Sequence, residues 1–563
     1  MPRTRRRKLI VFLCLLALPL LFVLGILGVA VYFYFSADFM KPSVQVDLRR
    51  YALTVNTDSL KVSPYGRLVL SRNGLWEGYI KGSPIDRGAA YGVMAKELLE
   101  YQESVFVSQI RKIVPSESRV HFLHKLIAIF NRNMAKSIPA EYREEIYGIS
   151  LSGSDAFNEF GSSYERQLNY HAAHDIGHAM QQYMLVGCSS FAAWGAQSED
   201  GELIVGRNFD FYVGDDFAKN KMVLTVKPDK GYSFISVSWP GMMGVLSGMN
   251  QEGLTITINA AKGPIPSQTA MPISLLARQI LQYAATIDEA FAIASKAKTF
   301  VAESLLIASV RDGRAAIIEK TPKKIALYDV GGQRVVCTNH YQSDEFKADK
   351  YNVENIQCSD SPYRHRRINQ LIDRCAPLSI FDAASILRNR YGIDDVDIGI
   401  GNEKSVNQYI AHHSVIFKPK QLKMWVSTSP WQLGKYVCFD FSRALDSAKY
   451  PECNLEEGVG DIPADSLQIV NECRRVREYR ELYLTIADAT KRAAHLPDSL
   501  IQRFLKVNPN HYQVYNGLGN YMEALGCRHE AISYWLKAIS LEVPRCDERD
   551  KIVKKIQSVD DEE

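Results

Sequence analysis

From Cys188 onward the chain becomes a series of short apolar alternations separated by turns, and this pattern restricts the fold more than any other feature. Alternation of this kind predicts strands with one buried face. The links are short and rich in turn-forming residues such as Asp200-Gly201, so neighbouring strands are expected to run antiparallel. The predicted strands are Ser190–Gln197, Leu203–Phe209, Met222–Val226, Phe234–Trp239, Val245–Ser247 and Leu254–Asn259.

Helical and extended patterns then alternate along the chain up to about residue 445. Strands followed by helices and then by further strands predict a layered α+β body. The region before Cys188, residues 45–187, is predicted to be mainly helical because its apolar positions recur at helical spacing. The later predicted helices are Ile273–Ala285, Ile287–Lys296, Arg366–Arg374 and Ile380–Arg390, and the later strands are Glu303–Val310, Ala315–Glu319, Lys324–Tyr328, Lys423–Thr428 and Gly434–Phe441.

The N-terminus combines a basic cluster, Arg3–Lys8, with an almost continuous apolar run, Leu9–Phe35. A bilayer-spanning helix needs about 20 apolar residues, whereas the core of a cleaved signal peptide has about 7–15. We therefore expect a single-pass signal anchor at 9–35 with a cytoplasmic tail at 1–8. The basic flank then places the catalytic body on the periplasmic or extracellular side. The alternative is a long signal peptide that is cleaved near Ala37.

Charge and cysteine spacing exclude several classes of protein. The formal net charge of the 563 residues is +4, and much of this excess lies in the first eight residues, so no nucleic-acid partner is expected. The ten cysteines form no CxxC pair, which leaves no zinc ribbon and no redox motif. If the body is exported, some of these cysteines form disulfides, but their pairing cannot be deduced from spacing.

The C-terminal part, residues 465–563, is predicted to be a helical appendage. Within it, residues 508–544 match the pattern of one tetratricopeptide (TPR)-like repeat, in which small residues such as Gly519 and Ala531 accompany Trp535. A single repeat cannot bury its own apolar face, so this unit is expected to pack on the helices before it. Helical packing and the binding of a protein partner remain equal alternatives for its role.

Cys188 stands where the helical region gives way to the first predicted strand. The strand that returns from the hairpin ends in Arg207 and Asp210, so the turn brings both residues back toward the thiol. A neighbouring guanidinium lowers the pKa of a thiol and makes it a better nucleophile. Asp210 is placed to orient either Arg207 or an amine beside the thiol. The alternative is an inert buried thiol beside a local ion pair.

Several short stretches, taken in order, resemble the autoproteolytic cysteine acyltransferase/hydrolase family of the Ntn (N-terminal nucleophile) superfamily. That family includes the acyltransferase that forms penicillin side chains and is related to penicillin V acylases, bile-salt (choloylglycine) hydrolases and acid ceramidase. The stretches are Arg-Gly-Ala-Ala-Tyr-Gly at 87–92, Gly-Cys-Ser-Ser-Phe-Ala-Ala-Trp-Gly at 187–195, Gly-Arg-Asn-Phe-Asp-Phe at 206–211, Gly-Met-Asn-Gln-Glu-Gly-Leu at 248–254 with Ile-Asn at 258–259, Thr-Asn-His at 338–340 and Ser-Pro-Tyr-Arg at 361–364.

The resemblance implies a four-layer αββα sandwich with its catalytic core at 188–445. It implies that cleavage of the Gly187–Cys188 bond makes Cys188 an N-terminal nucleophile, while residues 45–187 stay associated as an α chain. Arg207 and Asp210 would position and tune the thiol. The remaining site residues implied by the resemblance are Asn259 and Asn339, for the oxyanion hole and the free amine, and Arg364, as a further cation.

The implied chemistry needs neither a cofactor nor a metal. Cys188 attacks the preceding carbonyl, and Gly187 has no Cβ to hinder the strained backbone. The freed α-amine, whose reference pKa is about 7.7–8.0, then acts as the base for its own thiol. The expected substrate is a small N-acyl amide or other acyl donor, which forms a Cys188 thioester. Water hydrolyses this thioester, or an amine takes the acyl group.

Two alternatives belong to other functional classes. His171, His174 and His178 fall on one helical face with metal-ligand spacing, which is compatible with a zinc hydrolase, although the glutamate of HExxH is missing. The other alternative is a non-catalytic scaffold that works through its TPR-like tail and has an inactive core.

Overall fold

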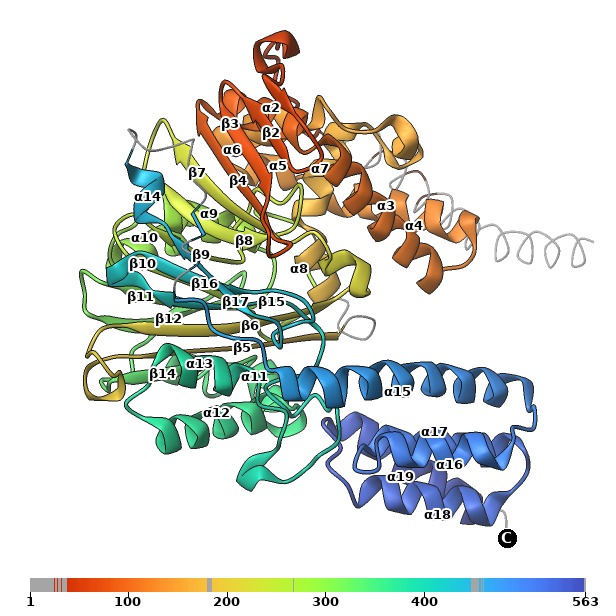
Figure 1. Cartoon of the computed structure of the whole chain (residues 1–563). Helices are drawn as coiled ribbons and strands as arrows, with labels where there is room; N and C mark the ends of the chain where they lie inside the picture. Colours follow the sequence, from red (N-terminus) through yellow and green to blue (C-terminus); the bar gives the residue numbers. More distant parts are fainter. Residues whose placement is uncertain are drawn as a thin grey trace, which may run out of the picture.

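The computed structural model describes residues 38–179, 185–266, 268–446, 455–456, 458 and 460–560, together with residues 25, 28 and 32. Over these residues the protein is a mixed α/β structure with two β-sheets stacked face to face (Figure 1). The predicted α+β class is therefore confirmed.

The larger sheet has 11 strands in the order β1-β2-β3-β4-β7-β8-β9-β10-β11-β12-β13. Its neighbours pair antiparallel except β4 and β7, which run parallel along seven residue pairs from Trp76↔Met222 to Gly82↔Pro228. The strands are β1 (Val55–Asn56), β2 (Leu60–Ser63), β3 (Gly66–Leu70), β4 (Trp76–Gly82), β7 (Met222–Pro228), β8 (Phe234–Ser238), β9 (Ser247–Asn250), β10 (Leu254–Ala260), β11 (Glu303–Ser309), β12 (Arg314–Lys320) and β13 (Ile325–Tyr328).

The smaller sheet has six strands in the order β14-β5-β6-β15-β16-β17, and all its neighbours pair antiparallel. Cys188 lies on β5, which is therefore an inner strand. The strands are β5 (Leu185–Ala193), β6 (Ile204–Tyr212), β14 (Arg334–Cys337), β15 (Ala411–Lys418), β16 (Lys423–Ser427) and β17 (Tyr436–Asp440).

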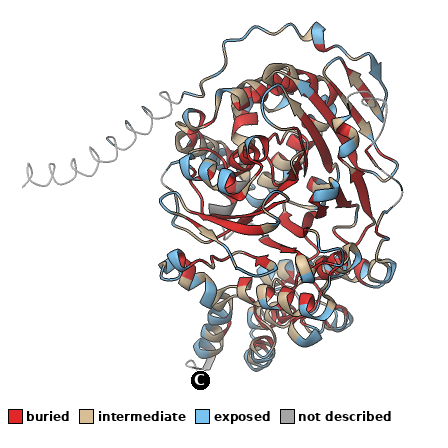
Figure 2. Cartoon of the chain, turned by 90° about the vertical axis from the view of Figure 1, so that its left-hand side faces the viewer, coloured by how far each residue is buried: buried red, intermediate tan, exposed pale blue. Residues whose placement is uncertain are grey.

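Apolar side chains fill much of the space between the two sheets. They also fill the space between each sheet and the helices on its outer face. Val205 and Val415 from the small sheet pack against Val223 and Ile235 from the large one. Figure 2 shows the buried residues concentrated along these strands. The outer face of the large sheet is covered by α9 (Ile273–Tyr283) and α10 (Ile287–Lys296), and that of the small sheet by α12 (Ser361–Cys375) and α13 (Ile380–Leu387). The layers thus follow the order helix, sheet, sheet, helix.

The region before Cys188 is mainly helical, as predicted for residues 45–187. Its first part, however, forms β1 to β4, which extend the large sheet and which the sequence did not predict. Parallel pairing of β4 with β7 joins this region to the core by a continuous ladder of hydrogen bonds. The helices are α2 (Pro84–Met94), α3 (Lys96–Ile113), α4 (Glu117–Asn131), α5 (Met134–Ser137), α6 (Ala140–Ser150), α7 (Ser163–His171) and α8 (Ala173–Ala179).

The glycines of the 87–92 stretch allow two helices to touch through their backbones. A Cβ on Gly88 would lie 2.0 Å from the carbonyl oxygen of Glu145, and one on Gly148 would lie 2.6 Å from the nitrogen of Ala89. Only glycine fits at such a crossing. Helix α2 therefore packs directly on α6.

The C-terminal residues form a separate layer of helices, called here the C-terminal bundle. Gly519 lies against the indole of Trp535. A Cβ on Gly519 would lie only 2.4 Å from the Nε1 atom of that indole. The helical appendage is confirmed, and its TPR-like character stays a prediction. Its helices are α15 (Ser466–Arg492), α16 (Asp498–Val507), α17 (Tyr512–Ala524), α18 (Arg528–Ile539) and α19 (Cys546–Asp560), and the core also contains α11 (Lys350–Cys358) and α14 (Ser442–Leu445).

The predicted membrane anchor is contradicted. Among the described residues, no helix combines the length and the apolar character needed to cross a bilayer. Length alone is insufficient, since the 27 residues of α15 carry many charged side chains. The predicted location, membrane-anchored with the body on the non-cytoplasmic side, is corrected with it. Apart from residues 25, 28 and 32, the expected tail at 1–8 and span at 9–35 lie outside the described residues.

Candidate active site

The hairpin of β5 and β6 brings Arg207 to the thiol of Cys188, as the sequence predicts. Cys188 pairs with Phe209, and Ser190 pairs with Arg207. Positions two residues apart on a strand share a face, so Cys188 and Arg207 both point toward the large sheet. The Nη2 atom of Arg207 lies 3.4 Å from the Cys188 sulfur and donates a hydrogen bond to it.

Arg207 is held in place by the opposite sheet. Its Nη1 donates to the carbonyl of Leu246 at 2.7 Å and to the hydroxyl of Ser247, and its Nη2 also donates to the carbonyl of Ile258. The guanidinium lies 4.4 Å from the ring centroid of Phe209, close enough for a cation–π contact. The side chain is fully buried, so the direction of its charge toward Cys188 is fixed.

Where β14 ends, side chains form the hydrogen bonds to the backbone of Cys188. Strand β14 pairs with β5 only from Ala193 to Ser190. Beyond that point the N–H of Cys188 donates to Oδ1 of Asn339 at 3.0 Å, and its carbonyl accepts from Nη1 of Arg364 at 2.7 Å. Arg364 also donates to Asn339 Oδ1 at 2.7 Å. Two of the predicted residues therefore hold the nucleophile by its main chain.

Asp360 completes this group. Its carboxylate accepts from Nε and Nη2 of Arg364 at 2.9 and 2.7 Å, four residues along α12. The pair stabilises the charge of a guanidinium that is almost fully buried. Asp360 was not predicted, although a carboxylate four residues before an arginine on a helix is a recognisable signal.

Asn259 lies near the nucleophile without touching it. Its Nδ2 donates to the carbonyl of Cys337 at 3.1 Å, and its Oδ1 accepts from the hydroxyl of Ser190 at 2.8 Å. These bonds tie the large sheet to β5 and to the end of β14. Asn259 thus supports the strand that carries Cys188, while Asn339 is the amide in direct contact.

Asp210 is a predicted site residue whose carboxylate has no hydrogen-bond partner. It pairs with Gly187 across the hairpin and is fully buried, and neither carboxylate oxygen has a hydrogen-bond partner. Burial raises the pKa of Asp210 to about 8, although Arg364 and Arg207 act in the opposite direction. In the uncut chain Asp210 is therefore largely a neutral acid near pH 7, beside the Gly187–Cys188 bond.

The surroundings of Cys188 do not favour its ionised thiolate form. Burial raises the pKa of Cys188, and the opposing effect of Arg207 is smaller. The sequence argument counted the guanidinium and did not count desolvation, which penalises a buried thiolate.

A histidine pair behind Arg207 escaped the sequence analysis. Ser247 hydrogen-bonds His413 Nε2 at 2.9 Å, and His413 Nδ1 lies 3.0 Å from Nδ1 of His412. All three residues are buried. Burial lowers the pKa of His412 to about 3 and that of His413 well below its ordinary value, so both rings are neutral. Two adjacent histidines in an otherwise apolar strand were the available signal.

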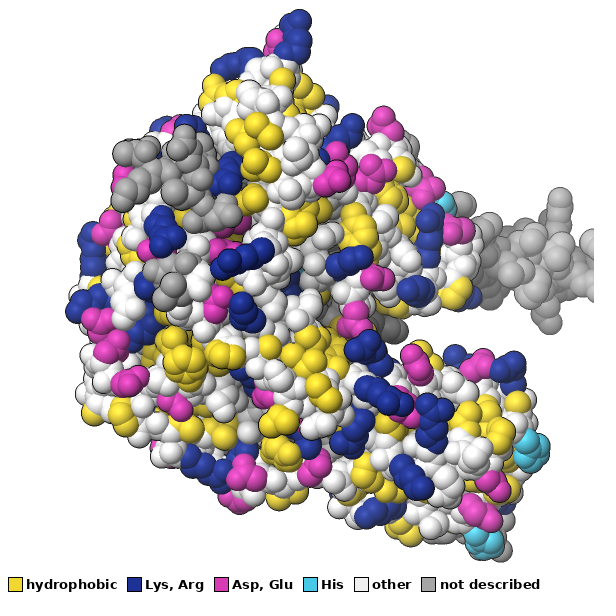
Figure 3. Space-filling view, viewed as in Figure 1, with side chains coloured by type: hydrophobic (Ala, Val, Ile, Leu, Met, Phe, Trp, Pro, Cys, Tyr) yellow, Lys and Arg dark blue, Asp and Glu magenta, His cyan; other side chains and the backbone are white. Residues whose placement is uncertain are grey.

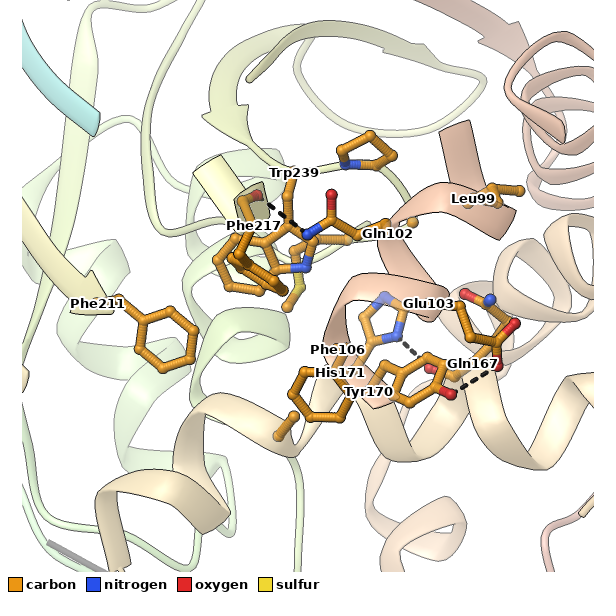
Figure 4. A pocket seen from close by; sticks show the side chains of 14 residues that line it. Leu99, Gln102, Glu103, Phe106, Gln167, Tyr170, His171, Phe211, Phe217 and Trp239 are labelled. Atoms are coloured by element: carbon orange, nitrogen blue, oxygen red, sulfur yellow. Dashed lines mark hydrogen bonds between the residues drawn. The ribbon is translucent and has the colours of Figure 1, made fainter. Parts of the chain in front are cut away.

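A cavity with several aromatic side chains in its wall lies beside β6, and Figure 4 shows the residues that line it. Phe106 from α3, Phe211 from β6, and Phe217 and Trp239 from loops contribute to its walls. The ring of Phe209, which faces Cys188 across the hairpin, stacks on Phe211 at 5.7 Å and on Trp239 at 6.4 Å between centroids. The cavity therefore lies beyond the Phe209 ring from the thiol.

Glu103 and the amide nitrogen of Gln102 have protein hydrogen-bond partners, whereas the Oε1 atom of Gln102 is buried without one. Glu103 accepts from Arg166 at 2.7 Å and from the hydroxyl of Tyr170 at 2.6 Å, and Gln102 donates to the carbonyl of Phe217 at 3.2 Å. The aromatic side chains of Phe106, Phe211, Phe217 and Trp239 form much of the remaining wall.

The three-histidine alternative finds no support in the geometry of His171. Its Nδ1 lies 2.7 Å from the carbonyl of Gln167, and its Nε2 accepts from the N–H of Met243 at 3.0 Å. Both ring nitrogens are therefore occupied by backbone groups. The side chains of His174 and His178 lie outside the described residues, and within the described part of the chain no cluster of three His, Cys, Asp or Glu side chains is arranged to hold a metal.

Comparison with known proteins gives a family match. The model of the acyl-coenzyme A:6-aminopenicillanic acid acyl-transferase family matches residues 196–429, which confirms the resemblance seen in the sequence. The matched range contains all the predicted site residues except Cys188, which lies just before it. A protein of undescribed function from Archaeoglobus fulgidus is 23% identical over 497 residues, which cover 80% of each chain.

Solved structures with similarity to this chain include two hydrolases. One is an N-acylethanolamine-hydrolyzing acid amidase ortholog from Caenorhabditis elegans, with 16% identity and a TM-score of 0.31 over 41% of this chain and 93% of that one. The other is a mutant of the conjugated bile acid hydrolase from Clostridium perfringens, with 12% identity and a TM-score of 0.32 over 45% and 92%.

Proposed function

From the match of residues 196–429 to the acyl-transferase family, we propose that this chain is a self-cleaving amidohydrolase or acyltransferase that acts on N-acyl compounds through a thioester on Cys188. One observation carries the proposal: Asn339 and Arg364 hold the N–H and the carbonyl of Cys188 while Arg207 donates to its sulfur. A buried structural cysteine needs none of these contacts.

The first reaction is cleavage of the chain itself. The Cys188 sulfur attacks the carbonyl carbon of Gly187, a C–S bond forms, the C–N bond breaks, and the thiol proton passes to the leaving amine. Water then hydrolyses the thioester, which leaves a carboxylate on Gly187 and restores the thiol. Arg207 stabilises the sulfur as it loses its proton.

The liberated amine finds acceptors already in place. Asn339 Oδ1 holds the same nitrogen before the cut, and Asp210 lies across the hairpin without a hydrogen-bond partner. An ammonium group at this position supplies the positive charge that Asp210 lacks, and so favours its ionised form. In its neutral form the amine is the base that takes the proton from the thiol during turnover.

Turnover uses the same residues on an external amide. Cys188 attacks the acyl carbon, the amine product leaves, and water or a second amine takes the acyl group from the thioester. The developing oxyanion needs N–H donors, and the amides of Asn339 and Asn259 are the proposed source. The aromatic cavity beyond Phe209 suits an apolar acyl group, because aromatic side chains form much of its wall.

The α fragment remains bound after the cut. It contributes β4 to the ladder with β7, and its Glu145 accepts from Arg278 of the other fragment at 2.8 Å through both carboxylate oxygens. In addition, Gly241 donates to the hydroxyl of Tyr91 at 3.1 Å and Ile273 to the carboxylate of Asp175 at 2.8 Å. None of these contacts depends on the peptide bond at 187–188.

The test is intact-mass analysis of the purified full chain under denaturing conditions. Two fragments, the second of which begins with Cys188, support the proposal. A single uncut chain, or a cut at another bond, refutes it.

A further inference from the structure

The C-terminal bundle grips one loop of the core, residues 399–410, called here the 399–410 loop. The side chain of Asn508 forms two hydrogen bonds with the backbone of Ile400. The N–H of Ile400 donates to Oδ1 of Asn508, and Nδ2 of Asn508 donates to the carbonyl of Ile400, each at 2.9 Å. Asn402 donates to the carbonyl of Glu542 at 2.9 Å. A Cβ on Gly399 would lie 2.6 Å from His511. The loop and the bundle are therefore closely fitted at several separate points.

Tyr409 is the most constrained residue of this loop. Its φ is +57°, in the left-handed region that residues with a side chain rarely adopt, and it is fully buried. Two residues of α15 hold it: Glu472 accepts from its hydroxyl, and Arg480 donates to its carbonyl at 2.7 Å. Figure 3 shows several basic side chains on the visible surface around α15. The bundle thus maintains a backbone conformation that is unfavourable by itself.

The neighbouring residue, Gln408, lies against Gly187. A Cβ on Gly187 would be 2.9 Å from Nε2 and 3.2 Å from Oε1 of Gln408. Gln408 is buried and donates to the carbonyl of Glu403 at 3.0 Å, so its amide group cannot turn away freely. The residue before the nucleophile is therefore confined by a side chain whose own position depends on α15.

We propose that Gln408 is a positioning residue for self-cleavage and that the C-terminal bundle, through Tyr409, is required to hold it there. This inference rests on the proposed cleavage at Gly187–Cys188. Gln408 packs on the Cα of Gly187 and limits the rotation of the carbonyl that the sulfur attacks. A misplacement of about 1 Å is enough to slow a reaction about 10²-fold, so confinement of this carbonyl has a large effect on rate.

The decisive experiment combines Gly187→Ala with Gln408→Ala in the full chain. Cleavage is followed by gel and intact mass during cell-free synthesis, so that the precursor is seen from the start. Gln408→Ala alone should slow cleavage, because Gly187 loses its support. Gly187→Ala alone should slow it as well, because the new methyl group meets the Gln408 amide. Adding Gln408→Ala to Gly187→Ala should speed cleavage again, because it makes room.

This reversal of sign separates positioning from general damage. A residue that merely stabilises the fold slows cleavage in both backgrounds when it is removed. If Gln408→Ala slows the Gly187→Ala chain further, or changes neither background, the role assigned to Gln408 is overturned.

A second pair of variants tests the part played by the bundle. Tyr409→Phe removes the hydroxyl that Glu472 holds and should slow cleavage. Tyr512→Phe is the matched control, because Tyr512 is a buried tyrosine whose hydroxyl donates to Glu548 at 2.5 Å, entirely within the bundle. It should cleave at the wild-type rate. Equal rates for the two variants overturn the role of the bundle. A wild-type chain that is never cut refutes the proposed function instead, so the two failures are distinguishable.

Discussion

The amide oxygen of Asn339 lies 3.0 Å from the backbone nitrogen of Cys188, at the point where β14 no longer covers the strand. A side chain here replaces a strand neighbour. A β-ladder would bind an amide nitrogen just as well, but it would not accommodate an ammonium group with three protons. The end of β14 therefore leaves this nitrogen to a side-chain acceptor, an arrangement that suits the proposed new N-terminus.

Cys188→Ala should give one uncut and inactive chain with the same fold. It lacks the sulfur atom that attacks in both reactions. Cys188 itself lies in the apolar core, so the apolar side chain of alanine should leave the fold unchanged. Cys188→Ser should cut slowly, because a hydroxyl ionises far less readily than a thiol. Intact mass, circular dichroism and hydrolysis of a panel of N-acyl amides check this. Cleavage of Cys188→Ala at the same bond would assign the cut to another protease.

Removal of either asparagine should affect both turnover and stability, because Asn339 also bonds the N–H of Cys188, the carbonyl of Ala260 and Arg364. Asn339→Ala should lower kcat by about 10²–10³-fold, the usual effect of losing one oxyanion donor. Asn259→Ala should also lower the free energy of unfolding, by about 1–3 kcal/mol, because it leaves buried partners at Ser190 and Cys337 unsatisfied. Steady-state kinetics and urea unfolding separate these effects. Wild-type kcat for both variants would remove them from the site.

Asp210 should make the uncut chain less stable as the pH rises. The pKa of Asp210 is about 8 in the folded, uncut chain, against 3.8 for an ordinary Asp side chain, which represents the unfolded state. The Cys188→Ala background keeps the chain uncut for this measurement. Below pH 3.8 the carboxyl is protonated in both states. Between the two values only the unfolded chain has released the proton, so the free energy of unfolding falls by at most about 1.4 kcal/mol per pH unit.

Asp210→Asn removes this titration. Its stability should match that of the parent near pH 4 and exceed it by the largest margin near pH 8. Urea unfolding at several pH values checks this prediction. Parallel curves for the two proteins would show that Asp210 is already ionised in the folded chain.

Arg278→Met should loosen the two fragments of the cut protein. It leaves the buried Glu145 with Arg87 alone, and loss of one partner from a buried ion pair is unfavourable by about 3–5 kcal/mol. The fragments should then separate on size-exclusion chromatography at lower urea. Arg111→Met is the control, because its ion pair with Glu159 is exposed and contributes about 0–1 kcal/mol. Equal effects would contradict the role of Arg278.

Local patterns predicted most of the core strands but missed β14 and β15, and they also missed the first strands, β1 to β4. Helix α10 begins as predicted because Thr286 and Glu289 form a capping box, a signal contained within four residues. Strands β1 to β3 have only two, four and five residues, and β4 depends on a parallel partner, Met222–Pro228, far along the chain. No local pattern reports such a partner.

The candidate site divides in the same way. Hairpin register alone placed Arg207 beside Cys188, whereas Asn339 and Arg364 came from the family resemblance. Gln408 had no signal, because its position is set by α15, which begins more than fifty residues later. The contact between Gln408 and Gly187 involves a single residue of one loop, so it produces no repeating pattern that could be recognised in the sequence.

The parallel ladder of β4 and β7 has a consequence for the lifetime of the protein. While the chain is whole, β4 reaches β7 as part of the same molecule, at the high effective concentration that a covalent connection provides. After the cut, two separate polypeptides would have to meet again at whatever concentration the cell contains. A denatured mature molecule should therefore fail to reassemble, and each copy would fold only once, in the interval before its own cleavage.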